Sequence, residues 1–385
     1  TSISGGMNCV FIGTIETYRK SGVDKVNKAY KFRMYPTNEQ KTMFAKTFGC
    51  SRFIYNKMLE DKIGYYKTNK EMLNNTPAQY KVEFEFLKEV DSLALANAQI
   101  NLQTAFSNFF RLPKVGFPKF KSKHKSRMAY TTNNQRGSIR IEDNKIKLPK
   151  VGYVKIKKHR EIPEHYILKS ATVSKTRTGK YYVSVLFEYE ETIEPVEIQK
   201  VVGLDFSMSG LFVSSDNEFA NYPRYYRNSL SKLQKEQRKL SKCQKDSNNR
   251  SKQRLKVARL HEKVTNQRRD FLHQLSRKIT NSYDAVCIEN LNMQGMSQAL
   301  NFGKSVHDNS WGTFTTLLSY KLKDAGKRLI KIDKWFPSSK TCSGCGAVKD
   351  ELSLSERIYT CSCGLELDRD INAAINIKNQ GLLLI

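Results

Sequence analysis

The segment 340–377 constrains the fold more than any other part of the chain. It carries a Cys-x-x-Cys pair, Cys342 and Cys345, and, after fifteen intervening residues, a Cys-x-Cys pair, Cys361 and Cys363. Four thiolates at such spacing are typical of a tetrahedral zinc site, whereas a redox Cys-x-x-Cys motif would need only one pair. Because four sulfurs fill the coordination shell of zinc, the segment predicts a structural zinc ribbon at 340–366.

Three acidic residues stand where carboxylates could converge. Asp205 ends the apolar stretch 201–205 and Glu289 lies near the end of the apolar stretch 284–290, both of which predict buried strands. Asp370 opens a helical pattern directly after the second cysteine pair. Adjacent strands of a mixed sheet can hold the first two acids, and a facing helix can supply the third. Such a set suits phosphodiester hydrolysis with Mg²⁺ or Mn²⁺, which prefer oxygen ligands.

Each of these acids taken singly is weak evidence, because an aspartate at a strand end is more often a cap or a turn former. The prediction therefore depends on their conjunction. Of the two acids beside the ribbon we favour Asp370, since Asp368 lies closer to the cysteines and suits a helix cap or a pair with Arg369.

The charge of the chain points to a polyanionic partner. Its 385 residues contain 66 Lys and Arg against 37 Asp and Glu, a formal net charge of +29. Such an excess opposes compact folding unless a polyanion neutralises it, and 19 Tyr and 20 Phe offer stacking surfaces for unpaired bases. Nucleic acid is the predicted partner; a merely soluble basic protein is the alternative. A hydrophobic content of 39% can fill the cores of two or three domains.

The other cysteines and the hydropathy predict a cytoplasmic protein. Cys9, Cys50, Cys243 and Cys287 are scattered, which fits a reducing compartment better than a disulfide framework. The sequence has no apolar run near the roughly 18 residues that span a membrane and no signal-peptide core. Thr1–Gly6, which precede Met7, are set aside.

The first half combines helices with a β domain. Alternation over Lys28–Pro36 predicts a strand, and Thr37 with Gln40 predicts a helix start. Helices are expected from there to about Phe48, from Cys50 to Lys67 and over Glu85–Phe110, followed by a basic loop. Period-two segments then predict an antiparallel, barrel-like domain that the strand at 28–36 completes; they lie at 138–141, 145–148, 153–157 and 181–189.

The second half follows the acidic segment 190–195, where we place the main boundary. A hairpin strand is expected at 211–215, a helix at 311–326 and a strand at 328–333, with a polar loop at 293–308. Residues 224–278 hold 18 Lys or Arg and four acids, which predicts two long basic helices broken near 246–249. With this excess of one sign, contact with phosphates is favoured over a purely solvated hairpin.

Several motifs resemble those of the TnpB proteins, transposon-associated RNA-guided endonucleases related to compact type V CRISPR effectors. They are GLDFSMSGLFVSSD at 203–216, IENLNMQGM at 288–296, WFPSSKTCSGCG at 335–346 and YTCSCGLELDRDINAAINI at 359–377. In the first half KAYKFRMYPTNEQ, FGCSRFIYNKML, NLQTAFSNFFR and VGFPKFK are also similar to that family. The likeness covers nearly the whole chain, from Lys28 to Ile377.

The resemblance implies an α+β multidomain protein. Its parts would be an N-terminal segment with the first strand of a wedge β-barrel (1–36), recognition helices (37–112), the rest of the barrel (113–195), an RNase H-like, RuvC-like core (196–339) with a basic helical insertion (224–280), a zinc ribbon that binds target nucleic acid (340–366) and the end of the core (367–385). The family's three acids fall on Asp205, Glu289 and Asp370.

The resemblance also implies partners. A monomeric protein would bind a guide RNA made from the transposon end, recognise a short motif beside the DNA target and cut the unwound strands in one site. Contacts to that motif would fall near Asp91–Asn97 and Thr131–Asn134. The candidates for nucleic-acid contact are Ser92, Asn97, Thr132, Asn133, Lys119 and Lys121. Ser92 and Ala96 are smaller than the residues found in some relatives, and the Cys-x-Cys pair is shorter than the usual one.

Three alternatives stay open at this point. A CRISPR effector of the same fold would differ by its genomic neighbourhood. A non-cleaving RNA-guided repressor is expected to lack one of the three acids. A strand-transfer transposase would join DNA ends without RNA.

Overall fold

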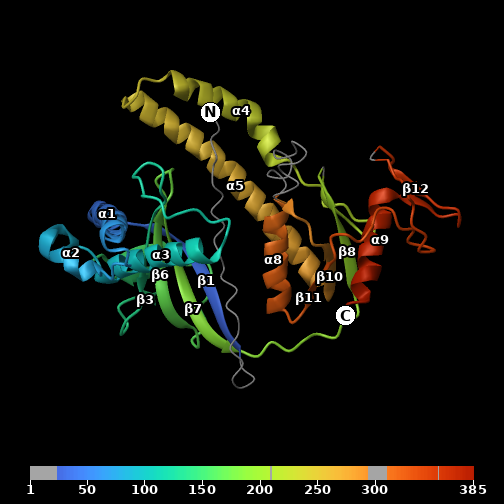
Figure 1. Cartoon of the computed structure of the whole chain (residues 1–385), viewed down its shortest axis with the longest axis horizontal. Coiled ribbons are helices and arrows are strands. Elements are labelled where there is room, and N and C mark those ends of the chain that lie inside the picture. The colour runs from blue at the N-terminus through green and yellow to red at the C-terminus, as the bar shows by residue number, and fades with distance from the viewer. Residues whose placement is uncertain (1–23, 209, 294–309, 354) are drawn as a thin grey trace. The chain divides into compact units, whose positions relative to one another are not determined.

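The computed structural model describes residues 24–208, 210–293, 310–353 and 355–385 (Figure 1). The chain divides into two compact units, the first ending at Thr192 and the second beginning at Ile193, within the acidic segment 190–195. Cys9 and nearly all of the loop expected at 293–308 lie outside the described residues. Within those ranges, no helix is both long enough and apolar enough to cross a membrane.

The first unit is built on an antiparallel seven-stranded sheet in the order β2-β6-β7-β1-β5-β4-β3. The strands are β1 (Asp24–Tyr35), β2 (Met128–Asn133), β3 (Arg140–Glu142), β4 (Lys145–Leu148), β5 (Gly152–Lys157), β6 (Ile167–Lys175) and β7 (Tyr181–Glu191). As predicted, the early strand β1 joins the later ones: it lies in the middle of the sheet and pairs with β7 and β5.

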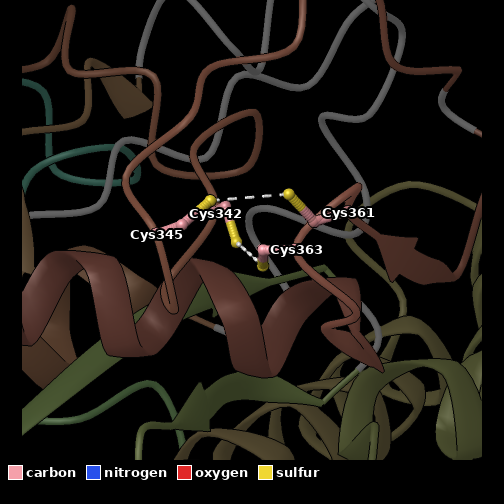
Figure 2. Close-up of side chains that lie close together, drawn as sticks. All are labelled: Cys342, Cys345, Cys361 and Cys363. Atoms are coloured by element: carbon pink, nitrogen blue, oxygen red, sulfur yellow. Dashed lines mark hydrogen bonds between the residues drawn. The ribbon is translucent and has the colours of Figure 1, made fainter.

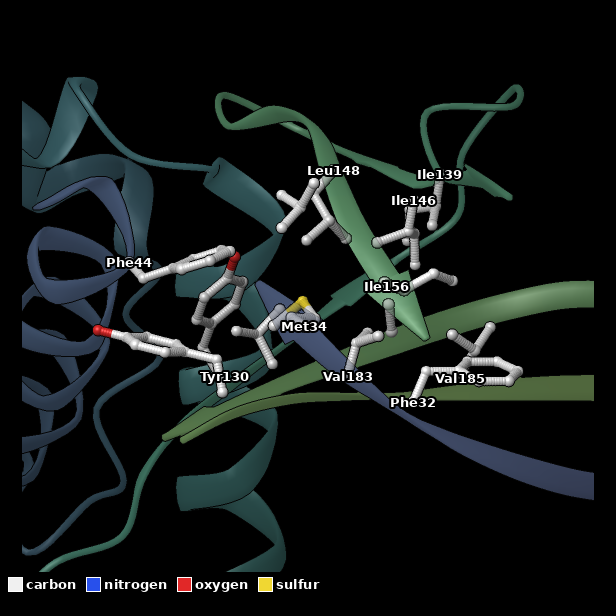
Figure 3. Packing of buried hydrophobic residues seen from close by; sticks show 14 of the residues in the cluster. Phe32, Met34, Phe44, Tyr130, Ile139, Ile146, Leu148, Ile156, Val183 and Val185 are labelled. Carbon is white, nitrogen blue, oxygen red and sulfur yellow. The ribbon is translucent and has the colours of Figure 1, made fainter. Parts of the chain in front are cut away.

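One core serves the whole sheet (Figure 3). It takes Tyr130 from β2 at one edge, Phe32 from the central β1 and Ile146 from β4 near the other edge. Alternate residues of β7 point into it, as period-two patterning requires. Because strands from both ends share one core, the sheet is strongly curled. A ladder that closes β2 onto β3 is not among the pairings of the described strands.

The first helix corrects the sequence prediction. Helix α1 (Asn38–Asn69) runs unbroken through Gly49, where two helices were expected to meet. A glycine inside a helix costs only about 1 kcal/mol relative to alanine. Burial on both sides outweighs this cost, since Phe44 and Phe48 enter the sheet core and Ile54 enters a second, helical core. The predicted start is confirmed by a capping box between Thr37 and Gln40.

The prediction of one helix over 85–110 is also wrong, because the long helix begins later than expected. The chain forms α2 (Pro77–Glu83), a 3₁₀ turn η1 (Glu85–Lys88) and then α3 (Ser92–Arg111). Asp91 sets the start of α3, because its carboxylate accepts a hydrogen bond from Leu93 N at 3.0 Å. The basic loop that follows has no helix or strand between 112 and 127, as predicted.

The second unit contains the mixed sheet predicted from the acid-bearing strands. Its order is β11-β10-β8-β9, in which β8 (Val201–Ser207), β10 (Ala285–Glu289) and β11 (Arg328–Ile332) are parallel and β9 (Leu211–Ser214) is antiparallel. Side chains alternate between its two faces. Val202, Leu204, Val286 and Ile288 pack with α5 (Asn248–Ser282) and α8 (Trp311–Asp324), whereas Cys287 and Ile332 pack with Ile377 of α9 (Arg369–Leu382).

Two further features complete this unit. Helix α4 (Tyr225–Lys242) and α5 form the predicted pair of long basic helices, with the break at 243–247. The ribbon carries a small antiparallel pair, β12 (Ile358–Thr360) and β13 (Glu366–Asp368), and β13 leads directly into α9.

Candidate active site

Asp205 and Glu289 lie side by side at the carboxyl ends of two parallel strands. The ladder between β8 and β10 pairs Gly203 with Cys287 and Leu204 with Ile288, and the two acids are the next residue on each strand. Since side chains alternate, both acids share the face of the sheet that carries Gly203 and Cys287. This is the face that α9 covers.

Gly203 allows α9 to touch the backbone of β8. A Cβ at this position would lie 2.1 Å from the carbonyl oxygen of Ala374 and 2.7 Å from the amide nitrogen of Lys378. From this contact, Asp205 lies two residues further along the strand, and Asp370 lies one helical turn before Ala374. The distance along β8 from Gly203 to Asp205 and the distance along α9 from Ala374 back to Asp370 are both roughly 6 Å. The close contact at Gly203 therefore brings the start of α9 to Asp205.

The three carboxyl groups are close enough to influence one another electrostatically. Burial raises the pKa of Asp205 well above its usual value, and the carboxylates of Glu289 and Asp370 raise it further. Burial also raises the pKa of Glu289, while the hydrogen bond that Ser338 Oγ donates to Glu289 Oε1, at 2.5 Å, works in the opposite direction. The site therefore concentrates negative charge that its own cations compensate only in part.

Two arginines lie beside the carboxylate of Asp370. Arg369 Nη2 lies 3.1 Å from Asp370 Oδ1, and Arg357 Nη1 lies 4.0 Å from Oδ2. Asp368 caps α9, because its Oδ1 accepts from the amides of Asp370 and Ile371 at 2.9 and 3.1 Å. The predicted cap is confirmed, because Asp368 accepts from backbone amides. The Asp370 carboxylate pairs with Arg369 and Arg357 and raises the pKa of Asp205.

The four ribbon cysteines form one cluster (Figure 2). Their sulfurs all lie within 4.8 Å of one another, with 3.7 Å between Cys342 and Cys363 and 3.6 Å between Cys345 and Cys361. Tetrahedral zinc with Zn–S bonds of about 2.3 Å separates its sulfurs by about 3.8 Å. The donor set and its spacing therefore fit zinc, and the Cys-x-Cys pair supplies both of its thiols.

Buried polar side chains connect the ribbon to the acids. Asn376 Nδ2 donates to the carbonyl oxygens of Ser338 and Thr341 at 2.8 and 2.6 Å, and Asn372 Nδ2 donates to Thr341 at 2.7 Å. Asn372 Oδ1 also accepts from the amide of Ser343 at 2.9 Å. Because Ser338 in turn binds Glu289, α9 fixes both the first cysteine loop and a catalytic candidate.

These supporting residues were not predicted from the sequence. Two asparagines four residues apart within the otherwise apolar run INAAINI were a usable signal, since buried amides require partners. Ser338 gave no comparable signal, because its partner Glu289 lies 49 residues away.

The basic helices present an exposed row of cations. On α4, the side chains of Lys235, Arg238, Lys239 and Lys242 line a hollow of about 460 Å³ along one face. On α5, Lys252, Lys256, Arg259 and Lys263 are exposed at a spacing of three to four residues, which places them on a single stripe. Both rows fit contact with a phosphate backbone.

The nucleic-acid candidates of the first unit have different environments. Ser92 is exposed at the start of α3, where it accepts from Lys81 Nζ at 2.8 Å, and Asn97 Nδ2 donates to the carbonyl of Leu93 at 2.8 Å. Thr132 is fully buried in β2, so a base could reach its hydroxyl only if neighbouring residues moved. Asn133, the last residue of β2, is partly exposed.

A hollow of about 650 Å³ lies beside these candidates. Its lining comes from the start of α3 and from the loops after β2 and β4: Asp91, Leu93, Gln135, Arg136, Ser138 and Pro149. In the basic loop Lys119 is exposed, whereas Lys121 Nζ lies 3.6 Å from the centre of the Tyr55 ring, where burial lowers its pKa to about 8. Asn56 fixes the backbone of Lys121 through two hydrogen bonds.

Three family models match parts of the chain. Their descriptions are "Probable transposase" over residues 184–300, "Cas12f1-like, TNB domain" over 311–377 and "Helix-turn-helix domain" over 26–71. The last of these segments is β1 and the unbroken α1 in the structure.

Relatives that are similar along nearly the whole chain show the family to which it belongs. A protein of Streptomyces pristinaespiralis named "Putative RNA-guided DNA endonuclease" is 36% identical over 374 residues, which cover 94% of this chain and 90% of the relative. The Escherichia coli K12 protein "Putative RNA-guided DNA endonuclease InsQ" is 28% identical over 378 residues, 92% of each chain. The chain belongs to this family of RNA-guided DNA endonucleases, the TnpB family whose motifs it carries.

A solved structure shows the same fold. The protein in a cryo-EM structure of a Cas12f1–sgRNA–target DNA complex superimposes with a TM-score of 0.58 at 14% sequence identity, covering 92% of this chain and 99% of the other. The mixed α+β fold with several domains is therefore shared across a large sequence distance.

Proposed function

We propose that this protein is a divalent-metal-dependent DNA endonuclease that a guide RNA directs to its target. The observation that carries the proposal is the convergence of Asp205, Glu289 and Asp370 from two parallel strands and the facing helix. The presence of all three acids in this chain argues against a non-cleaving repressor.

The residues of the site fit Mg²⁺ or Mn²⁺. The three side chains offer only hard oxygen ligands. The pKa of Asp205 is raised first by burial and then by the charges of Glu289 and Asp370, and a bound cation would offset both effects. Bound there, such ions would activate a water molecule and stabilise the leaving oxygen. Ser338 holds the Glu289 carboxylate in place, and Arg369 holds that of Asp370.

Zinc in the ribbon has a structural role in this proposal. Four thiolates leave no open position for a water or a substrate, so Cys342, Cys345, Cys361 and Cys363 take no part in the chemistry. Instead the ribbon is tied to the site through α9, because Asn376 binds both the cysteine loop at Thr341 and Ser338, which supports Glu289.

The other parts of the chain would bind RNA and DNA as a monomeric ribonucleoprotein. The proposed wedge domain is the curled sheet, which consists of β1 and the strands in 113–195. Residues 37–112 are the proposed recognition helices. The nuclease core comprises 196–339 and 367–385, and the ribbon (340–366) contacts target nucleic acid. Ser92, Asn97, Thr132 and Asn133 are the proposed contacts to the target-adjacent motif, and Lys119 and Lys121 are further candidates for nucleic-acid contact. Because cations dominate these surfaces, binding should weaken steeply with salt.

A strand-transfer transposase is the second candidate, favoured by the description "Probable transposase" of the model that matches residues 184–300. A compact CRISPR effector shares the proposed chemistry and differs in the origin of its guide. Strand transfer and RNA-guided cleavage differ in one respect: a transposase joins DNA ends in the absence of RNA.

The purified protein with its copurified RNA separates these possibilities. Sequencing of that RNA gives the guide, and DNA that matches it should be cut with Mg²⁺ whereas a scrambled sequence of equal length should not. Cleavage without RNA, or joining of DNA ends, would contradict the proposal.

A further inference from the structure

The two tryptophans of the chain have opposite environments. Trp311, at the start of α8, is 3% exposed and belongs to the core of the second unit, whereas Trp335 is 80% exposed. Tryptophan contributes more apolar surface than any other side chain and is highly buried on average. A side chain of this kind held in solvent suggests a surface that binds something flat and apolar.

Trp335 lies in the loop that leaves the carboxyl edge of the sheet after β11. Strand β11 ends at Ile332, which pairs with Glu289 in the ladder between β10 and β11. Trp335 is three residues beyond Ile332, and three residues later Ser338 returns to bind Glu289. The short loop that carries the tryptophan therefore begins and ends at the same catalytic candidate.

The loop holds its side chains in a defined arrangement. The amide of Trp335 donates to Asp333 Oδ1 at 2.7 Å, which fixes the turn. Its neighbour Phe336 packs against the core cluster of Cys287, Ile332 and Ile377, so Phe336 anchors the loop while Trp335 stays exposed.

A cation accompanies the exposed ring. Lys334 Nζ lies 4.6 Å from the centre of the Trp335 ring. An aromatic face with an ammonium group beside it matches a nucleotide, in which a flat base is joined to a negatively charged phosphate. Stacking of bases on aromatic side chains tolerates any sequence, since every base has a π-face. This suits an enzyme whose specificity comes from base pairing.

We propose that Trp335, with Lys334, stacks an unpaired base of the DNA strand being cut and so positions that strand at Asp205, Glu289 and Asp370. The inference rests on the proposed function and adds the strand-positioning site to it. Trp335 touches the substrate but no reacting atom in this proposal. Its loss should slow cleavage without preventing target binding, because base pairing with the guide supplies most of that binding.

The test uses the ribonucleoprotein, DNA that matches its guide, and the variants Trp335→Ala and Trp335→Phe. Stacking on one aromatic side chain corresponds to on the order of 10-fold in rate, so Trp335→Ala should cut about 10-fold more slowly in single-turnover reactions. Trp335→Phe should recover most of the rate, and all three proteins should bind the target equally. Failure of the wild type to cut would reject the proposed function itself.

Abasic substitution in the DNA distinguishes stacking from a structural role. One abasic nucleotide, moved in single steps through the cleaved region, should at one position slow the wild type by about the same factor as Trp335→Ala, and should leave that variant's rate unchanged. If the wild type cuts and Trp335→Ala has the wild-type rate, the stacking proposal is wrong. It is also wrong if abasic DNA slows both proteins equally at every position.

Discussion

Gly203→Ala tests whether the close contact between α9 and β8 positions the catalytic acids. The added Cβ would lie 2.1 Å from the carbonyl oxygen of Ala374, a backbone atom that no side-chain rotation can move. The helix must therefore retreat by roughly 1 Å before the contact reaches a tolerable van der Waals separation. Asp370, one turn away on the same helix, would move with it.

The expected cost falls more on catalysis than on folding. Overpacking of a core by one methyl group typically destabilises a protein by about 1–3 kcal/mol, which leaves a domain of this size folded. A displacement of about 1 Å at a catalytic group can lower the rate on the order of 100-fold. Single-turnover cleavage by the ribonucleoprotein measures the second effect, and thermal unfolding measures the first.

Gly312→Ala is the matched control. Gly312 lies in α8 of the same unit, and an added Cβ there would meet nothing within 4 Å. This variant should keep the wild-type rate and unfold at the wild-type temperature or slightly above it, because alanine favours a helix more than glycine does. If Gly203→Ala is folded at the assay temperature and cuts within about threefold of the wild-type rate, close packing of α9 does not position Asp370, and the reasoning fails.

Three further predictions concern protons, Mg²⁺ and zinc. The raised pKa of Asp205 means that the folded protein holds its proton more tightly than the unfolded chain, so metal-free stability falls as pH rises through the folded pKa. Asp205→Asn should therefore raise the metal-free unfolding temperature at neutral pH and not at pH values below the unfolded pKa; a lower temperature at neutral pH would contradict this. For the wild type, the Mg²⁺ concentration needed for half-maximal cleavage should rise as pH falls. Cys345→Ser should lose the single zinc ion measured by mass spectrometry and cut more slowly, because the cysteine loop and Ser338 share Asn376 as a hydrogen-bond partner and Ser338 holds Glu289. Full zinc retention would contradict the four-cysteine site.

Local sequence patterns were sufficient to predict the two strands and the helix start that carry the three acids. The apolar runs before Asp205 and Glu289 are strands because they are buried on both faces, by α5 and α8 on one side and by α9 on the other. The acids follow at the strand ends. Likewise, Asp368 could be assigned as a cap because its carboxylate immediately precedes a helical pattern.

Tertiary contacts explain what the sequence left undetermined. Gly49 has the propensity to end a helix, but two separate cores hold α1 together across it. The link from Asn376 through Ser338 to Glu289 joins three distant segments and has no local signature. Thr132 lies two residues after the buried Tyr130 in β2, so the alternation of a strand predicts that its side chain points inward. The family resemblance indicates only which segment contacts the target-adjacent motif, not which of its side chains are exposed.

Cleavage by the Asp370→Ala variant tests the central claim most directly. Wild type and variant, each assembled with the copurified RNA, would be given matched duplex DNA and Mg²⁺, and both cutting and binding would be measured. The wild type should cut and Asp370→Ala should not, while RNA and DNA binding stay equal, because Asp370 would hold metal and makes no contribution to guide pairing. Persistent cutting by the folded variant would show that the catalytic site does not include Asp370.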